Sequence, residues 1–190
     1  MGDAFLQKTG SQNARIRFEQ GEKQKDYLIW KGSQFPRLFQ GKPSHLERIH
    51  PITRKQYGYW RWQSNASPEI GKWRNIFYED GKKKVPKNIS ELLTAPLALA
   101  VWYMDDGYYY LRDKSSYIYL GRVSQKESSL LENAIVENFD LKPKIYDKKE
   151  KGYALFFGVN ETKKLHELIR EYVIPSMQYK LGESNTSLTP

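Results

Sequence analysis

Two short acidic motifs contain the side chains best suited to chemistry. Asp105 and Asp106 follow the apolar residues 97–104, and Gly2-Asp3-Ala4 lies at the corresponding point of an internal repeat. If residues 97–104 form a helix, both acids lie at its C-terminal end, which already carries partial negative charge. A positive group should offset them, and a hard divalent cation with oxygen ligands is the natural candidate. The alternative is that the two acids only solvate a loop. Carboxylates from two repeats favour a metal site that acts on two phosphodiesters.

The apolar stretch that precedes Asp105 predicts a short helix over residues 97–106. Thr94 is its expected N-cap, Pro96 is tolerated in its first turn and Gly107 occupies the usual C′ position. The stretch is well short of the roughly 20 apolar residues that cross a membrane. The first residues do not form the apolar core of an export signal. We therefore expect an intracellular protein of the cytoplasm, nucleoid or an organelle such as a mitochondrion or chloroplast.

One pattern of elements occurs twice along the chain. Strand-like alternation at residues 15–18 and 117–120 is followed each time by a polar turn and a helical stretch. A hairpin follows in each half, through residues 57–62 in the first and pairing 144–146 with 153–157 in the second. Helix starts then come at Ser67-Pro68 and at Asn160. We expect a first repeat at 1–80, a linker at 81–93, a second repeat at 94–181 and a flexible tail at 182–190.

Each half is expected to be an α+β unit whose sheet is covered by helices on one face only. Apolar residues at helical spacing predict the covered side; they are Ile70, Trp73 and Phe77 in the first half, and Leu131, Ala134, Ile135, Phe139, Leu165, Leu168, Ile169 and Val173 in the second. The other face is left to solvent or to a ligand. Its expected residues in the first half are Arg15, Arg17, Tyr59 and Arg61, which alternate with Ile16, Phe18, Trp60 and Trp62.

The charge balance indicates an anionic partner. The chain has 190 residues and a formal net charge of +9, while its 39% hydrophobic content is enough for a core. Basic and aromatic residues on an open sheet suit nucleic acid, although such a face can also be merely solvated. The absence of cysteine excludes a disulfide framework, a thiolate metal site and a cysteine nucleophile.

The sequence around Asp106 resembles the LAGLIDADG homing endonucleases. The segment Leu99-Ala100-Val101-Trp102-Tyr103-Met104-Asp105-Asp106-Gly107 matches the family signature, with Asp106 in the place of the metal-binding acid. Further matches narrow the resemblance to the two-repeat monomers of the I-SceI type; they are Gly2-Asp3-Ala4-Phe5, Arg17-Phe18-Glu19, Lys83-x-Val85-Pro86 and Ile174-Pro175-x-Met177-x-Tyr179-Lys180-Leu181. The resemblance therefore runs from Gly2 to Leu181.

The resemblance implies two pseudo-symmetric αββαββα repeats that form a saddle over double-stranded DNA and cut both strands. Asp3 and Asp106 would then bind Mg²⁺ or Mn²⁺, which lowers the pKa of an attacking water and offsets charge on the leaving oxygen. Lys83 and Lys180 match basic residues that lie near the scissile phosphates in the family, and Glu19 and Gln125 match polar strand-end positions near the metals. The residues expected to contact DNA are Arg15, Arg17, Tyr59, Arg61, Arg122 and Lys144.

The start of the chain departs from the family pattern. Most positions of the first signature are absent, because the chain opens at Met1-Gly2-Asp3. We therefore expect a largely missing first helix and an uncovered apolar face at Leu97, Val101 and Met104. An intron-encoded or free-standing gene is expected rather than an intein. Two alternatives to a site-specific endonuclease stay open: an RNA-binding intron maturase, and an inactive DNA-binding remnant.

Overall fold

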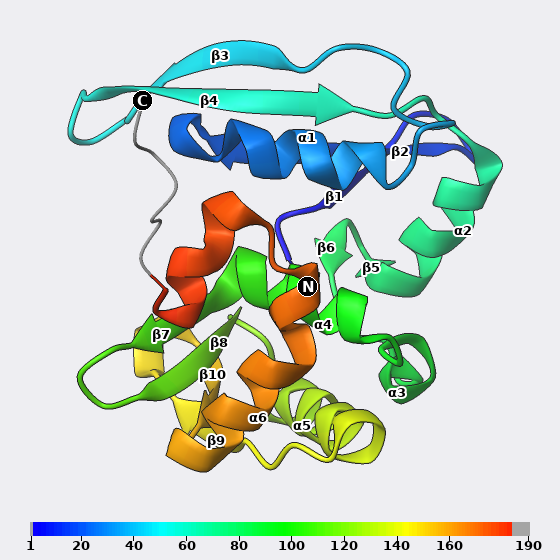
Figure 1. Ribbon diagram of the computed structural model, residues 1–190. Helices are drawn as coiled ribbons and strands as arrows, with labels where there is room; N and C mark the ends of the chain where they lie inside the picture. Colours follow the sequence, from blue (N-terminus) through cyan, green and yellow to red (C-terminus); the bar gives the residue numbers. More distant parts are fainter. Residues whose placement is uncertain (1, 184–190) are drawn as a thin grey trace. The chain divides into compact units, whose positions relative to one another are not determined.

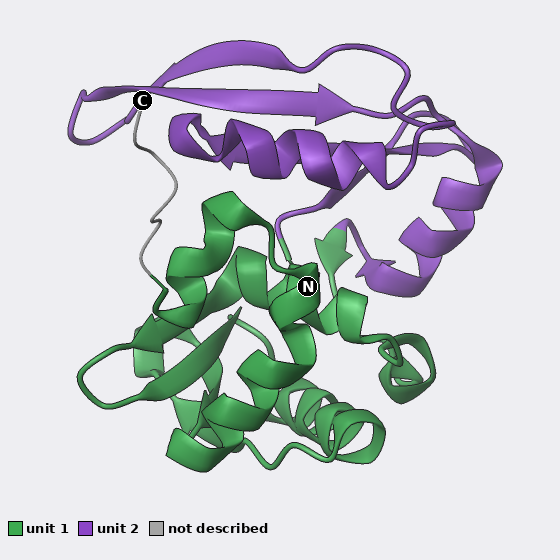
Figure 2. Cartoon of the chain, viewed as in Figure 1, with its two compact units in different colours: residues 1–2, 82–190 green, residues 3–81 purple. Residues whose placement is uncertain are grey.

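The computed structural model describes residues 2–183 of the chain, so most of the expected tail at 182–190 lies outside the described residues. Within that part the chain divides into two compact units (Figure 2). Unit 2 is Asp3–Gly81, and unit 1 contains Gly2 and the described residues from Lys82 onward. None of the helices in residues 2–183 is long and apolar enough to cross a membrane.

Unit 2 has the element order ββαββα. Its principal elements are β1 (Phe5–Lys8), β2 (Ala14–Gly21), α1 (Lys25–Ser33), β3 (Ser44–Ile49), β4 (Gln56–Gln63) and α2 (Pro68–Phe77), with a 3-10 turn at Glu22–Gln24 and a short strand β5 at Tyr78–Glu79. The four long strands form an antiparallel sheet in the order β1-β2-β4-β3. In Figure 1, α1 runs along one face of this sheet.

Unit 1 repeats that order after a short strand and two helices. Its elements are β6 (Lys82–Lys83), α3 (Ile89–Leu92), α4 (Pro96–Asp106), β7 (Gly107–Tyr110), β8 (Ser115–Gly121), α5 (Gln125–Phe139), β9 (Lys144–Asp147), β10 (Tyr153–Phe157) and α6 (Val159–Ile169), with 3-10 turns at Lys149–Lys151, Arg170–Tyr172 and Pro175–Leu181. The sheet order β7-β8-β10-β9 is the order of unit 2. The predicted α+β fold with two equivalent four-stranded sheets is therefore confirmed.

Alternation along the strands gives each sheet one buried and one accessible face. In β2, Ile16 and Phe18 are buried against Leu28 of α1 and Ile70 of α2, while Arg17 between them is only half-buried. A strand places successive side chains on opposite faces, so the apolar set faces the helices and the arginines face away. The two-faced sheet expected from the sequence is confirmed for this strand.

The helix starts follow local capping chemistry in part. The predicted cap at Ser67 is confirmed, because its hydroxyl accepts a hydrogen bond from the Ile70 amide and Pro68 follows at the first helical position. Thr94 and Asn160 were wrong as caps, since the N-cap residues are Ala95 and Gly158. In α5 a capping box joins Ser124 and Glu127.

Three further expectations need correction. Gly107 does follow the last residue of α4, but its φ is −80° and it starts β7 rather than a left-handed turn. Glycine is required there by space, because a Cβ would lie 2.3 Å from the Tyr103 carbonyl oxygen. Trp73 is 40% exposed rather than buried. Met104 is buried at 1% exposure, so the apolar stripe on α4 is not uncovered along its whole length.

Residues 81–93, expected to be a linker, contain β6 and α3, and those from Lys82 onward belong to unit 1. The Asn138 side chain of α5 donates hydrogen bonds to the carbonyl oxygens of Ser90 and Leu93, at 2.7 and 2.9 Å. The Val85 amide donates to Glu127 at 3.0 Å. This segment is therefore held by specific contacts to α5.

Candidate functional site

The candidate site of unit 1 is built at the C-terminal end of α4. The helix presents Leu99, Ala100 and Trp102–Met104 to the interior, and it ends at Asp105 and Asp106. Both acids are half-buried. They therefore stand at the boundary between the core and solvent, next to backbone carbonyls that have no partner within the helix.

The positive group expected to offset the two acids is supplied in part by Lys180. Its ammonium donates a hydrogen bond to the Gly107 carbonyl oxygen at 2.8 Å and lies 3.4 Å from that of Asp105. A cation at this position interacts favourably with the helix dipole and satisfies carbonyl groups that the helix leaves free. The ammonium of Lys180 is thus bound to the backbone carbonyl groups on both sides of Asp106, those of Asp105 and Gly107.

Gly2 is the second group that contacts the acids. Its amide donates a hydrogen bond to Asp106 Oδ2 at 3.0 Å, and its carbonyl oxygen accepts one from Lys83 Nζ at 3.0 Å. Gly2 has a φ of +67°, and a Cβ on it would lie 2.5 Å from Asp105 Oδ2. Only glycine combines this backbone conformation with so close an approach. Unit 1 therefore gathers Lys83, Asp106 and Lys180, three of the residues predicted for the site.

Beneath Lys180 lies a buried polar network. The Tyr103 hydroxyl donates to the Lys180 carbonyl oxygen at 2.9 Å and lies 3.0 Å from Ser116 Oγ and 3.1 Å from His166 Nε2. Burial, with the charge of Arg170, lowers the pKa of His166 to about 4, and burial raises that of Tyr103. Both groups are therefore neutral near pH 7. The network ties the backbone of Lys180 to the signature helix.

The other predicted metal ligand, Asp3, belongs to unit 2. Its side chain is exposed, and its Oδ2 accepts a hydrogen bond from Gln20 Nε2 at 3.1 Å. Gln20 is buried at 5% exposure on β2. Gln20 was not among the residues predicted for the site. The alternation along β2 places residue 20 on the buried face, and a polar residue at a buried position is the signal that could have identified it.

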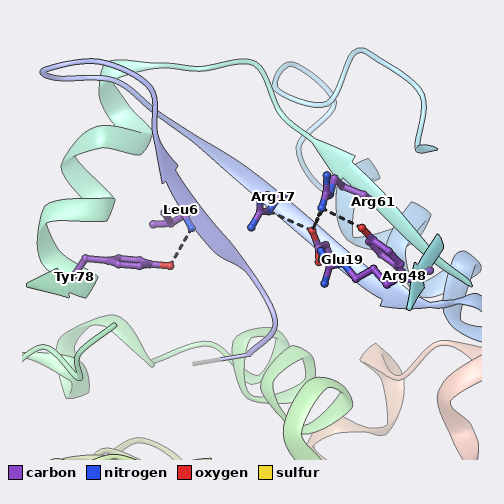
Figure 3. A network of polar contacts seen from close by, with 7 residues as sticks. Leu6, Arg17, Glu19, Arg48, Arg61 and Tyr78 are labelled. Atoms are coloured by element: carbon purple, nitrogen blue, oxygen red, sulfur yellow. Dashed lines mark hydrogen bonds and ion pairs between the residues drawn. The ribbon is translucent and has the colours of Figure 1, made fainter. Parts of the chain in front are cut away.

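Glu19 contacts arginines on the open face of the unit 2 sheet (Figure 3). Its carboxylate lies 2.7 Å from Arg61, 3.1 Å from Arg48 and 3.4 Å from Arg17. Three guanidinium groups around one carboxylate leave a net positive cluster, which we call the arginine cluster. The geometry therefore associates Glu19 with this face, although the sequence placed it in the catalytic set.

Two further residues of this face differ from expectation in detail. Tyr59 lies on the predicted face, but it is only 8% exposed, because the Arg48 guanidinium lies 4.3 Å from its ring centre. Arg15 is paired with Gln7 across β1 and β2, and its Nε and the Gln7 Oε1 are buried without a hydrogen-bond partner among the described residues. Tyr59 therefore packs against arginine side chains, and its ring is not exposed to a ligand.

The remaining predicted residues lie apart from one another in unit 1. Lys144 is exposed on β9, and exposed Arg122 follows β8. Arg122 lines an open hollow of about 470 Å³ together with Asp147, Lys149, Glu150 and Tyr153. Gln125, expected at a strand end, is instead the first residue of α5 and is exposed.

A divalent cation is compatible with this acid set. No three His, Cys, Asp or Glu side chains gather in a metal-binding group within residues 2–183. Mg²⁺, however, is commonly held by one or two carboxylates, several waters and the phosphates of a substrate. The half-buried carboxylate of Asp106 at a helix end supplies hard oxygen ligands of that kind. The donor set fits a cation that is completed by a phosphate.

Two sheets of identical strand order, each following an acidic motif, define a duplicated α+β protein of the LAGLIDADG type. The model of the LAGLIDADG DNA endonuclease family matches residues 1–165. The chain belongs to this family.

Similar proteins include curated relatives and solved structures. Protein RecA of Mycolicibacterium flavescens is 30% identical over 207 residues, covering 98% of this chain and 46% of that protein. Cytochrome b mRNA maturase bI2 of Debaryomyces hansenii is 26% identical over 96% of this chain and 70% of its own length. The homing endonuclease I-WcaI bound to its DNA recognition sequence matches with a TM-score of 0.85 and 24% identity, over 95% of this chain and 80% of that one. This chain thus spans about half the length of the RecA relative.

Proposed function

We propose that this chain is a site-specific endonuclease that hydrolyses both strands of duplex DNA with Mg²⁺ or Mn²⁺. The observation that carries the proposal is the arrangement around Asp106, whose carboxylate is held by the Gly2 amide at 3.0 Å while Lys180 is fixed beside it. Family membership and a net charge of +9 support the same partner. The protein is expected to act as a monomer, with one acid contributed by each repeat.

In this proposal Asp106 and Asp3 would each hold a divalent cation. A divalent cation held there would lower the pKa of an attacking water and offset charge on the leaving oxygen. Lys83 and Lys180 carry ammonium groups that can donate to phosphate oxygens as negative charge develops. The hydrogen bond from the Gly2 amide fixes the orientation of the Asp106 carboxylate. The arginine cluster of unit 2 binds the DNA backbone or bases.

The test is selection of cut duplexes from a randomised plasmid library with the purified chain. Cleavage at one recurrent sequence in Mg²⁺, and none in excess EDTA, is the expected result. Recovery of no preferred sequence, or equal cutting in EDTA, would contradict the proposal. A solved structure of I-DmoI in complex with its target DNA in the presence of Mg²⁺ makes this ion the first to try.

A second function is favoured by one observation, the match to the cytochrome b mRNA maturase over 96% of this chain. An RNA-binding maturase would use the same basic faces and would not need Asp106. Competition between labelled duplex DNA and intron RNA distinguishes the two functions. Preferential binding of RNA, unaffected by Asp106→Asn, would favour the maturase.

A further inference from the structure

The accessible faces of the two sheets have different chemistry. In unit 1 the face turned away from the helices carries aromatic rings, which are those of Tyr108, Tyr110, Tyr117, Tyr119, Tyr146 and Phe156. We call this set the tyrosine layer. Tyr108 is 52% exposed and Tyr146 is 41% exposed. The layer is thus accessible to a ligand, as is the arginine cluster of unit 2.

Strand register shows that the two chemistries occupy equivalent positions. Phe5, two residues after Asp3, pairs with Arg17. Tyr108, two residues after Asp106, pairs with Tyr117. Because each pair lies at the same distance from its acidic motif, Arg17 and Tyr117 correspond. Counting two residues further along β2 and β8 places Tyr119 at the position of Glu19.

The tyrosine layer is an apolar surface with neutral hydroxyl groups. The Tyr110 and Tyr119 hydroxyls are 3.0 Å apart, and burial with this contact raises the pKa of Tyr119 to about 12. Burial also raises the pKa of Tyr117. The rings pack on one another, with Tyr117 and Phe156 centres 4.9 Å apart. Lys148 lies 4.1 Å from the Tyr117 ring centre, so positive charge borders the layer.

These surfaces suit different base edges in the major groove. Guanidinium groups pair in a bidentate manner with the O6 and N7 acceptors of guanine, whereas apolar side chains contact the C5-methyl group of thymine. Arg48 and Arg61 supply the first kind of group in unit 2. Ring faces and edges of the tyrosine layer supply the second in unit 1.

We infer that the recognition sequence is chemically divided, with guanine contacts concentrated in the half read by unit 2 and thymine-methyl contacts in the half read by unit 1. This inference rests on the proposed function, because it names the substrate that the same faces bind. Tyr146 is then a specificity-determining residue of the thymine-rich half, and Arg48 is one of the guanine-containing half.

The experiment uses the full chain and the best duplex from a binding selection carried out in EDTA. Replacing thymines by deoxyuridine removes only the methyl groups and is expected to weaken binding about fourfold for each contacted base. Replacing guanines by 7-deazaguanine exchanges the N7 acceptor for a C–H group and is expected to weaken binding roughly tenfold for each bidentate contact. We expect the first effect in one half-site and the second in the other.

Two substitutions test which unit reads which half of the recognition sequence. Tyr146→Ser should reduce the response to deoxyuridine and leave the response to 7-deazaguanine unchanged, and Arg48→Ser should do the reverse. Both side chains are exposed on strands, and thermal melting verifies that each variant folds. Equal responses of both half-sites to both analogues would overturn the inference while leaving duplex recognition intact. Failure to enrich any duplex would instead overturn the proposed function, and this inference with it.

Discussion

The ammonium of Lys180 donates a hydrogen bond of 2.8 Å to the carbonyl oxygen of Gly107, directly after the last acid of α4. Its own carbonyl oxygen accepts a hydrogen bond from Tyr103 of the same helix. Lys180 is therefore held at both its side chain and its backbone. A lysine that only solvated a surface would not need two such anchors, so the arrangement supports a role in the proposed reaction.

We predict that Lys180→Met lowers the rate of DNA cleavage by about 100-fold at saturating DNA, the size of effect typical of one lost transition-state donor. DNA affinity should change by less than about threefold, because one phosphate contact contributes little to a large interface. Lys163→Met, on the exposed side of α6, is the matched control. Equal losses of rate in both variants would remove Lys180 from the site.

Gly2→Ala should disturb the acids directly. The substitution places a Cβ 2.5 Å from Asp105 Oδ2 at a residue with φ of +67°. We expect a loss of roughly 1–2 kcal/mol in the free energy of unfolding and a large loss of cleavage. Gly10→Ala is the control, since nothing lies within 4 Å of its Cβ position. Full activity of Gly2→Ala would show that the Gly2 amide does not position Asp106.

Glu19→Gln separates a binding role from a catalytic one. Removing the carboxylate leaves Arg17, Arg48 and Arg61 uncompensated, so affinity for unrelated duplex DNA should rise and depend more steeply on salt. Discrimination between the target and other sequences should fall, because the guanidinium groups lose their orienting partner. Salt titrations with target and random duplexes measure both effects. Loss of cleavage at unchanged affinity would return Glu19 to the catalytic set.

The stability of the fold should depend on pH through His166. Its pKa in the folded state is about 4, below the ordinary value of 6.5. Between these values the unfolded chain binds more protons, so the free energy of unfolding rises with pH and levels off above about pH 6.5. The contribution of this residue across the window is roughly 3 kcal/mol.

His166→Gln should flatten the pH dependence of the free energy of unfolding, measured by denaturant titration between pH 4 and pH 7. The control is His45→Gln. The His45 ring lies on the exposed side of β3, with its Nε2 3.3 Å from Glu22. An unchanged slope in the His166 variant would show that another group governs the dependence.

Local patterns in the sequence predicted most of the fold. The alternation around Ile16 and Phe18, the Ser67 cap and the apolar helix before Asp105 each depend on neighbours within a few residues, and each was confirmed. Thr94 failed as a cap because Ala95 takes the boundary position, a difference of a single residue.

The parts of the site that the sequence did not predict depend on contacts between residues that lie far apart in the chain. Gln20 reaches Asp3 across 17 positions, and the hydroxyl of Tyr103 meets His166 across 63. Arg48 and Arg61 reach Glu19 only once β2, β3 and β4 have paired. No periodicity or spacing shows such partners, because strand register and helix packing create them. The roles of the predicted site residues accordingly stay predictions.

Asp106→Asn shows whether cleavage needs the carboxylate at the end of α4. The substitution keeps the shape of the side chain and an oxygen that can accept from the Gly2 amide, while removing the ligand charge. Cleavage of the selected duplex by the variant and the parent should be compared in Mg²⁺ at saturating protein, with affinity measured in EDTA. We expect unchanged affinity within about threefold and no double-strand cleavage, since Asp106 would hold the metal in the proposed mechanism. Double-strand cleavage at the parent rate would contradict it.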